Sequence, residues 1–275
     1  MPCIRRDFAN PSTTSSERVA QTRAPAFRLI MNKAALRTTA ASVPLLILSF
    51  WVALYLAWNT LSTVNFLYPW LHDQMGLGAT IEKFGALNRY KDNFEATDRT
   101  EHIRLFKQIV HAINHNGEGL AEIRYHDPQG QPIDTLLRPP EVVHLQDVAN
   151  LLAALRLASY AAIATLAVLI ALIIGYRIPV PGLLRLFLIT AIICATTAGA
   201  IITIGATDVF YAVHTWVFPP DHQWFFYYQE SLMTTLMKAP DIFGYIAILL
   251  LLTAMTYFTL MLWITRRMAS MSTKN

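Results

Sequence analysis

The chain has 275 residues, of which 54% are hydrophobic and only 15% are charged. A soluble domain averages about 25% charged residues, so this composition excludes an ordinary soluble enzyme and indicates an integral membrane protein. The net charge of +4 comes without a basic stripe interleaved with aromatic residues, so no nucleic-acid partner is expected. Cys3 and Cys194 lie in segments that cannot easily meet, which argues against a disulfide framework or a zinc site.

Four apolar segments are long enough to cross a hydrocarbon core about 30 Å thick, which takes about 20 helical residues. The sequence therefore predicts an α-helical membrane protein with four transmembrane helices, over 44–68, 139–176 (with an outer extension), 183–206 and 242–265. Residues 1–43 are rich in Ser, Thr, Ala and Arg without apolar periodicity. They predict a disordered basic tail, within which Met31 is an alternative start.

Lys and Arg residues predict the orientation, because basic residues in short segments beside a span are retained in the cytoplasm. They gather before the first span, between the second and third spans, and in the tail 266–275. Residues 67–147 and 207–241 instead carry more Asp and Glu than Lys and Arg. We therefore expect a bacterial inner-membrane protein with both termini in the cytoplasm and both long loops, with the active site, at the outer face.

Residues 69–138 are too long and too regularly patterned for a simple connection. Asp98 followed by Glu101 resembles a capping box, and apolar residues then recur at helical spacing until 114–117. Apolar residues alternate with polar ones over 121–126, and turn residues at 127–130 precede a second apolar run at 133–137. The pattern predicts a small extracytoplasmic α+β domain, with a helix and a β-hairpin, between the first and second spans.

A polar helix start leads into the second span. Pro139 and Pro140 suit the first helical positions, and Glu141 in the first turn complements the helix dipole. Glu141, His144 and Asp147 are spaced by three, so they share one helical face just outside the membrane. An imidazole between two carboxylates can act as an acid or base, bind a metal, or belong to a solvated interfacial patch. These residues alone leave all three alternatives open.

The aromatic outer loop 207–241 contains two further histidines. His214 lies near the outer end of the third span, at the level expected for His144. His222 lies in a turn that follows two prolines and is interpreted as an exposed loop histidine, since nothing places it near His144. Arg156 lies about two turns beyond Asp147, where it can either anchor the helix at the outer interface or contact a lipid ester or headgroup.

The polar helix start and the aromatic loop together resemble the bacterial lipoprotein intramolecular transacylase family. The resemblance lies in Glu141-Val-Val-His144-Leu-Gln-Asp147-Val148 and in His214-Thr-Trp-Val-Phe218, followed by Trp224-Phe225-Phe226 and Ser231-Leu232. Family members have four spans and an outer domain between the first two. They move the sn-2 acyl chain of a diacylglyceryl lipoprotein onto its N-terminal cysteine amine, giving a lyso-form lipoprotein. The resemblance implies that the partners are a lipidated lipoprotein N-terminus and membrane lipid.

Moving an acyl chain from oxygen to nitrogen requires proton transfer and oxyanion stabilisation, for which two imidazoles suffice without a cofactor or metal. We assign His144 as the general base, with Asp147 or Glu141 fixing its tautomer. His214 is then the acid or oxyanion donor, and the two roles can be exchanged. The expected substrate contacts are Arg156, Phe218 and Trp224.

Two other classes of function fit the same residues. The first is a metal-assisted membrane hydrolase with His144, Asp147 and His214 as ligands, although no H-E-x-x-H motif is present. The second is a non-enzymatic membrane assembly or scaffold protein, in which the outer domain binds a partner and the histidines are incidental. Chelator sensitivity would favour the hydrolase, and tolerance of both histidine-to-alanine changes would favour the scaffold.

Overall fold

The computed structural model describes the backbone of residues 15–272 and the side chains of residues 38–205 and 207–272. Within this range the chain is mostly helical, with a single two-stranded antiparallel sheet. The elements are α1 (Ser15–Thr63), α2 (Tyr68–Gln74), α3 (Leu77–Gly85), α4 (Arg99–Asn114), β1 (Arg124–His126), β2 (Pro132–Thr135), α5 (Pro139–Gly175), α6 (Leu183–Ile204), α7 (Ala206–Val217), α8 (Leu232–Met237) and α9 (Asp241–Ser272).

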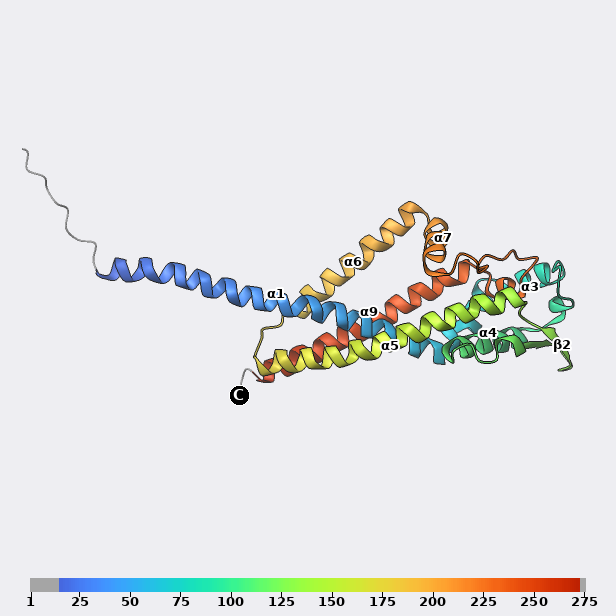
Figure 1. Cartoon of the computed structure of the whole chain (residues 1–275), viewed down its shortest axis with the longest axis horizontal. Helices are drawn as coiled ribbons and strands as arrows, with labels where there is room; N and C mark the ends of the chain where they lie inside the picture. Colours follow the sequence, from blue (N-terminus) through green and yellow to red (C-terminus); the bar gives the residue numbers. More distant parts are fainter. Residues whose placement is uncertain (1–14, 273–275) are drawn as a thin grey trace, which may run out of the picture.

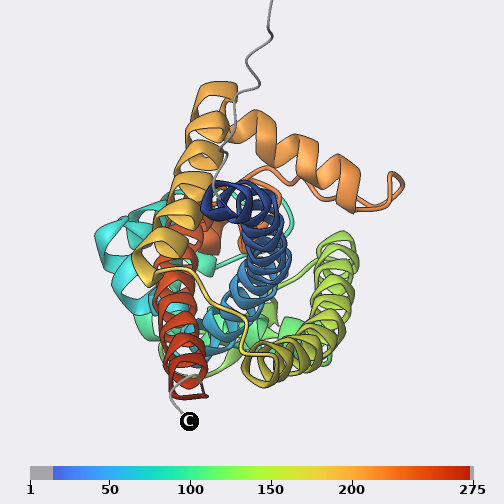
Figure 2. The ribbon, with the colours of Figure 1, turned by 90° about the vertical axis from the view of Figure 1, so that its left-hand side faces the viewer.

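Four helices in the described part of the chain are long and apolar enough to cross a membrane. They are Thr38–Thr63 of α1, and α5, α6 and α9. Helices α1, α5 and α9 pack along one another, while α6 leaves the bundle at an angle and leads to α7 (Figures 1 and 2). Ala53, Ala57 and Ala254 are fully buried in the core of the bundle. Such small residues let helix backbones approach closely, which is how helices associate in membranes.

Several boundaries differ from the sequence predictions. Residues 15–43, which the sequence predicts as a tail, form the first part of α1, and Ala, Arg and Leu are good helix formers that extend the helix of the span; residues 1–14 lie outside the described range. The first span ends at Thr63 rather than 68, because Asn65, Phe66 and Leu67 adopt positive φ angles that no α-helix contains. Helix α9 continues beyond 265 through Ser272, whose hydroxyl donates to the carbonyl of Ile174 at 3.2 Å.

Between α1 and α5 the chain forms the predicted helix and hairpin. Asp98 caps α4 by accepting from the backbone N–H of Glu101 at 2.8 Å, and α4 ends at Asn114. Strand β1 pairs with β2 in an antiparallel register that places Tyr125 opposite Asp134, with an irregularity next to Tyr125. The helix cap and the turn residues therefore gave correct local predictions.

Residues 207–241, predicted as an aromatic outer loop, contain two helices. Residues 206–217 form α7, and α8 packs into the same apolar core as α3 and α4. Tyr68 donates through its hydroxyl to the carbonyl of Leu236 at 2.7 Å, and the Lys238 ammonium donates to the carbonyl of Met75 at 2.9 Å. The second loop is therefore built into the core of the first. This shared core joins α8 and the first turns of α5 to the domain between α1 and α5.

Candidate active site

Helix α5 begins with a carboxylate buried among polar partners. Glu141 is fully buried, accepts from the backbone N–H of Arg138 at 2.7 Å, and accepts a hydrogen bond from the Ser231 hydroxyl at the start of α8. The Arg138 guanidinium lies 3.4 Å from the same carboxylate. Glu141 therefore closes the start of α5 and joins it to α8. Contrary to the expectation, its carboxylate bonds to these groups and not to His144.

His214 lies on α7, a short helix that starts directly after Gly205. The Nδ1 atom of its ring lies 2.7 Å from the carbonyl oxygen of Phe210. Since a carbonyl can only accept, Nδ1 carries the hydrogen, and neutral His214 has its lone pair on Nε2. Burial lowers the pKa of His214 below its ordinary value of 6.5, which keeps the ring neutral near pH 7.

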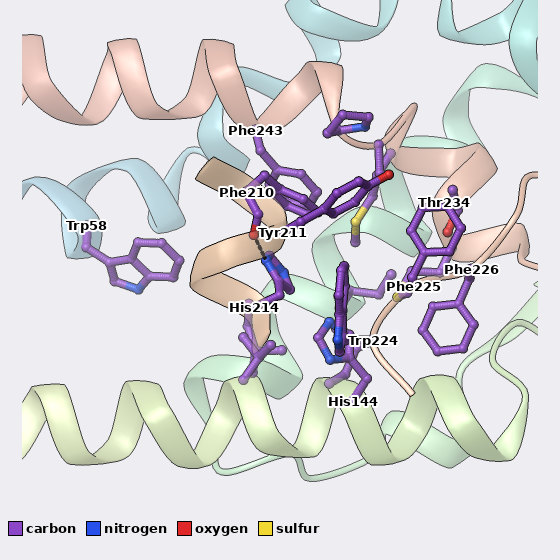
Figure 3. A pocket seen from close by; sticks show the side chains of 18 residues that line it. Trp58, His144, Phe210, Tyr211, His214, Trp224, Phe225, Phe226, Thr234 and Phe243 are labelled. Carbon is purple, nitrogen blue, oxygen red and sulfur yellow. Dashed lines mark hydrogen bonds between the residues drawn. The ribbon is translucent and has the colours of Figure 1, made fainter. Parts of the chain in front are cut away.

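His144 and His214 face each other across the space between α5 and α7 (Figure 3). Their ring centroids are 6.1 Å apart and their planes are inclined by 35°. Phe218 lies beside both rings, with its centroid 4.9 Å from that of His144 and 5.3 Å from that of His214. His144 is only 8% exposed, and its Nδ1 is buried without a hydrogen-bond partner. The two imidazoles are thus enclosed by aromatic carbon.

The two histidines line a cavity of about 380 Å³. Trp224 forms part of its wall, with its ring centroid 4.9 Å from that of His214. Most other lining residues are apolar and come from α1, α4, α5, α7, the loop before α8, α8 and α9 (Trp58, Ile109, Ile113, Leu145, Val148, Phe210, Phe225, Phe226, Met233, Met237, Phe243). Binding cavities for small molecules hold roughly 300–1,000 Å³. This one suits an apolar chain whose reacting group lies between two imidazoles.

Asp147 forms no hydrogen bond with His144 either. Its Oδ2 atom lies 2.6 Å from Nδ1 of His222, so the carboxylate positions the third histidine. His222 was interpreted as an exposed loop residue, but its side chain is only 34% exposed and is held against α5. The two residues are 75 positions apart in the sequence, so their pairing could not be predicted from local spacing. Only a contact between α5 and the loop after α7 brings the two together.

Arg156 is near the site but lines a different cavity. Its guanidinium donates to the carbonyl of Asn114 at 2.9 Å and to the side-chain oxygen of Asn116 at 2.9 Å, and thereby caps the end of α4. It lines a second cavity of about 650 Å³, which shares only Trp58 with the cavity of the two histidines. Of the three expected substrate contacts, Phe218 and Trp224 lie at the histidines and Arg156 does not.

The groups that orient the site could not be recognised from the sequence alone. The Phe210 carbonyl fixes the His214 tautomer, and a helical i, i+4 spacing was the available signal for it. Ser231 was recognised only as part of a motif, and its bond to Glu141 required the fold. Among the residues whose side chains are described, no three His, Cys, Asp or Glu residues lie close enough to hold a metal ion. The proposed ligand set of His144, Asp147 and His214 does not converge, since Asp147 is bonded to His222.

In the described part of the chain, four helices long and apolar enough to span a membrane, a small core between α1 and α5, and two facing imidazoles in an apolar cavity define a multi-pass membrane protein with a candidate active site. Residues 38–240 match the family model of the lipoprotein intramolecular transacylase Lit. The chain belongs to this family of bacterial membrane proteins.

Solved structures of the lipoprotein intramolecular transacylase Lit from Bacillus cereus have the same fold. One, with a histidine replaced by arginine, has a TM-score of 0.61 at 15% identity and covers 91% of this chain and 98% of that one. Another has a TM-score of 0.59 at 15% identity, with 88% and 98% covered. At this identity the likeness concerns the fold alone. No curated protein sequence matches the chain.

Proposed function

We propose that the protein transfers the sn-2 acyl chain of a diacylglyceryl lipoprotein onto the amine of the lipoprotein's own N-terminal cysteine. The amine nitrogen forms a bond to the acyl carbon, the bond from that carbon to the glycerol oxygen breaks, and one proton passes from nitrogen to oxygen. The product is a lyso-form lipoprotein. The observation that carries this proposal is the pair His144 and His214, 6.1 Å apart between ring centroids in an apolar cavity.

His214 is the better candidate for the group that moves the proton. Its Nδ1–H is held by the Phe210 carbonyl, and burial lowers its pKa, so Nε2 presents a lone pair near pH 7. Nε2 takes the proton from the amine as the new bond forms, then returns it to the glycerol oxygen. From the sequence, His144 was expected to be the base and His214 the acid or oxyanion donor, with an exchange of these two roles left open. The hydrogen bond of His214 favours the exchange.

His144 is then the oxyanion donor. Its Nδ1 is buried without a partner, and an orphaned N–H is rarer in proteins than an orphaned lone pair. The ring hydrogen is therefore favoured on Nε2, from which it can be donated to the oxygen of the tetrahedral intermediate. One such donor is typically worth about 10²–10³ in rate.

The absence of a nucleophilic serine or cysteine from the candidate site, among the described residues, fits an intramolecular reaction. The amine and the ester belong to the same molecule, so holding them side by side supplies the effective concentration that a covalent intermediate otherwise provides. The aromatic wall excludes water, which would otherwise compete with the amine for the ester. Phe218 and Trp224 are the proposed contacts of the acyl chain, since both lie against the imidazoles.

The distribution of Lys and Arg supports an orientation with both termini in the cytoplasm. The α+β domain formed between α1 and α5 is then extracytoplasmic, and the two histidines lie where the membrane bundle meets it. In this orientation the site receives lipoproteins that have already acquired their diacylglyceryl group.

Mass spectrometry of lipoprotein N-terminal peptides, from cells with and without this protein, tests the proposal. We expect N-acyl, S-monoacylglyceryl cysteine only when the protein is present. His144→Ala and His214→Ala should each reduce it by at least 10², in line with the usual worth of acid–base catalysis. His111→Ala is the matched control, because His111 is exposed on α4, away from the cavity.

Formation of the lyso-form at undiminished yield in both histidine variants would disprove the assigned site. Activity that is lost in EDTA and restored by a divalent metal would favour the metal-assisted hydrolase instead. We expect full activity in EDTA, because two imidazoles already account for the proton transfer.

A further inference from the structure

The second cavity, of about 650 Å³, lies between α1, α5 and the end of α4. Its lining residues on α1 run from Trp51 to Ser62, a length of about 16 Å at the rise of an α-helix. Only Trp58 also lines the cavity of the histidines, and its indole N–H is held by the side-chain oxygen of Asn114 at 2.8 Å. The two cavities are therefore separate spaces on either side of one tryptophan.

Polarity changes along the second cavity. The end next to α4 holds most of the polar side chains of the lining (Asn59, Ser62, Asn114, His115, Arg156) beside Leu152 and Leu155, and the other end is lined mainly by apolar and aromatic ones (Trp51, Leu54, Tyr55, Tyr160). The rings of Tyr55 and Tyr160 meet edge to face with centroids 6.0 Å apart, and Trp51 donates to the Ser159 hydroxyl at 3.1 Å. A glycerolipid likewise has a polar headgroup above apolar acyl chains, so the polarity of the cavity matches that of such a lipid.

The polar end carries a positive charge that no carboxylate balances. Neither an Asp nor a Glu lines the cavity, and Arg156 forms no ion pair with any carboxylate in the described part of the chain. A guanidinium has five N–H donors, and the two acceptors on Asn114 and Asn116 use two of them. The remaining donors match a phosphate, which arginine binds through paired hydrogen bonds.

We propose that this cavity binds an anionic membrane phospholipid, with its phosphate on Arg156 and one acyl chain along Trp51, Tyr55 and Tyr160. An ionisable residue inside a membrane span is expected to have such a partner, and basic pockets between spans bind lipid phosphates. The lipid is distinct from the lipoprotein substrate, which carries no phosphate on its diacylglyceryl group. The site therefore does not depend on the proposed reaction.

Native mass spectrometry of the full chain in detergent tests this site. The delipidated protein is incubated with dioleoyl phosphatidylglycerol, with dioleoylglycerol, which has the same chains and no phosphate, or with inorganic phosphate alone. We expect one phosphatidylglycerol per chain, retained about tenfold better than dioleoylglycerol, and no competition by millimolar phosphate. Arg156→Gln should bring the retention of phosphatidylglycerol down to that of dioleoylglycerol.

Two variants separate lipid binding from the capping of α4. Asn116→Gly removes one acceptor of Arg156 at a residue with φ of +57°, which glycine tolerates, and should retain the lipid as the wild type does. Arg185→Gln removes an exposed arginine at the start of α6 and is the charge control. Equal retention of both lipids by the wild type, or unchanged retention in Arg156→Gln, would overturn the proposal. Loss of binding in Asn116→Gly would also overturn it, by assigning the effect to the end of α4.

Discussion

At the scale of single residues, His214 and His222 have opposite electrostatic surroundings. Burial among aromatic rings lowers the pKa of His214. The hydrogen bond to Asp147 raises the pKa of His222 above its ordinary value of 6.5. His214 is therefore neutral, and available as a base, at a pH where His222 still holds its proton in part.

Titration of ¹³C-labelled histidine by NMR in detergent micelles checks this contrast. We expect the midpoint of His214 below 6.5 and that of His222 above it, with assignments from His214→Ala and His222→Ala. Asp147→Asn should lower the midpoint of His222, because it removes the charged acceptor. A His214 midpoint at or above 6.5 would contradict its assignment as a buried neutral base.

Residue types near the site could be predicted from sequence, and their pairing could not. Helical spacing placed Glu141, His144 and Asp147 on one face of α5, and that is a local property. Which carboxylate meets which partner depends on segments 75 and 90 residues away, at His222 and Ser231. Neither Glu141 nor Asp147, the two carboxylates that the spacing offers, is therefore hydrogen-bonded to His144.

At the scale of elements, the loop between α7 and α8 is held to α5 by the pair of Asp147 and His222. A histidine whose folded pKa is raised contributes its full stabilisation below the unfolded pKa of about 6.5 and loses it as pH rises through the raised value. We therefore expect this loop to be better ordered at pH 6 than at pH 9. The order matters for the site, because Trp224 follows His222 by two residues and contacts His214.

A spin label at Gln223→Cys, in a chain with Cys3 and Cys194 replaced by Ser, measures this order by EPR. Label mobility should increase from pH 6 to pH 9, and Asp147→Asn should show high mobility at both. Glu118→Gln, which removes an exposed carboxylate of the domain between α1 and α5, should behave like the parent. If the label mobility in the parent were the same at pH 6 and pH 9, the ion pair of Asp147 and His222 would not order the loop.

The bond between α5 and α8 predicts a second effect. Ser231 is fully buried, donates to Glu141, and caps α8 by accepting from the backbone N–H of Thr234 at 2.9 Å. Ser231→Ala removes the cap and leaves a buried carboxylate short of a donor, which should lower the free energy of unfolding by about 1–3 kcal/mol. Thermal unfolding in detergent measures it. Thr63→Ala, at an exposed threonine whose hydroxyl donates to the carbonyl of Thr60 in its own helix, is the control and should change little.

At the scale of the whole molecule, the charge distribution predicts which ends of the helices face outward. In a chain without native cysteines, Gln129→Cys lies in the hairpin turn and Ser272→Cys at the end of α9. A membrane-impermeant maleimide added to intact cells should label the first and not the second. Labelling of Ser272→Cys alone would invert the proposed orientation and place the two histidines at the cytoplasmic face.

Hydropathy and turn chemistry predicted the four spans, helix α4 and the hairpin, because each depends on residues close in sequence. The packing of residues 207–241 could not be predicted in this way. Its aromatic composition suggested an interfacial loop, whereas Tyr228 and Leu236 pack or bond within the core formed by the earlier loop. Packing between distant segments decided that structure, and no local pattern encodes it.

Gly205 joins α6 to α7 with φ of +110°, and a Cβ there would lie 3.0 Å from the Asp208 carboxylate. Any other residue would be strained at this joint. His214 thus lies on α7, which joins Gly205 at its start and the loop bonded to Asp147 at its end, whereas His144 lies on α5. The distance between the two imidazoles therefore depends on the direction that Gly205 gives α7 relative to α6.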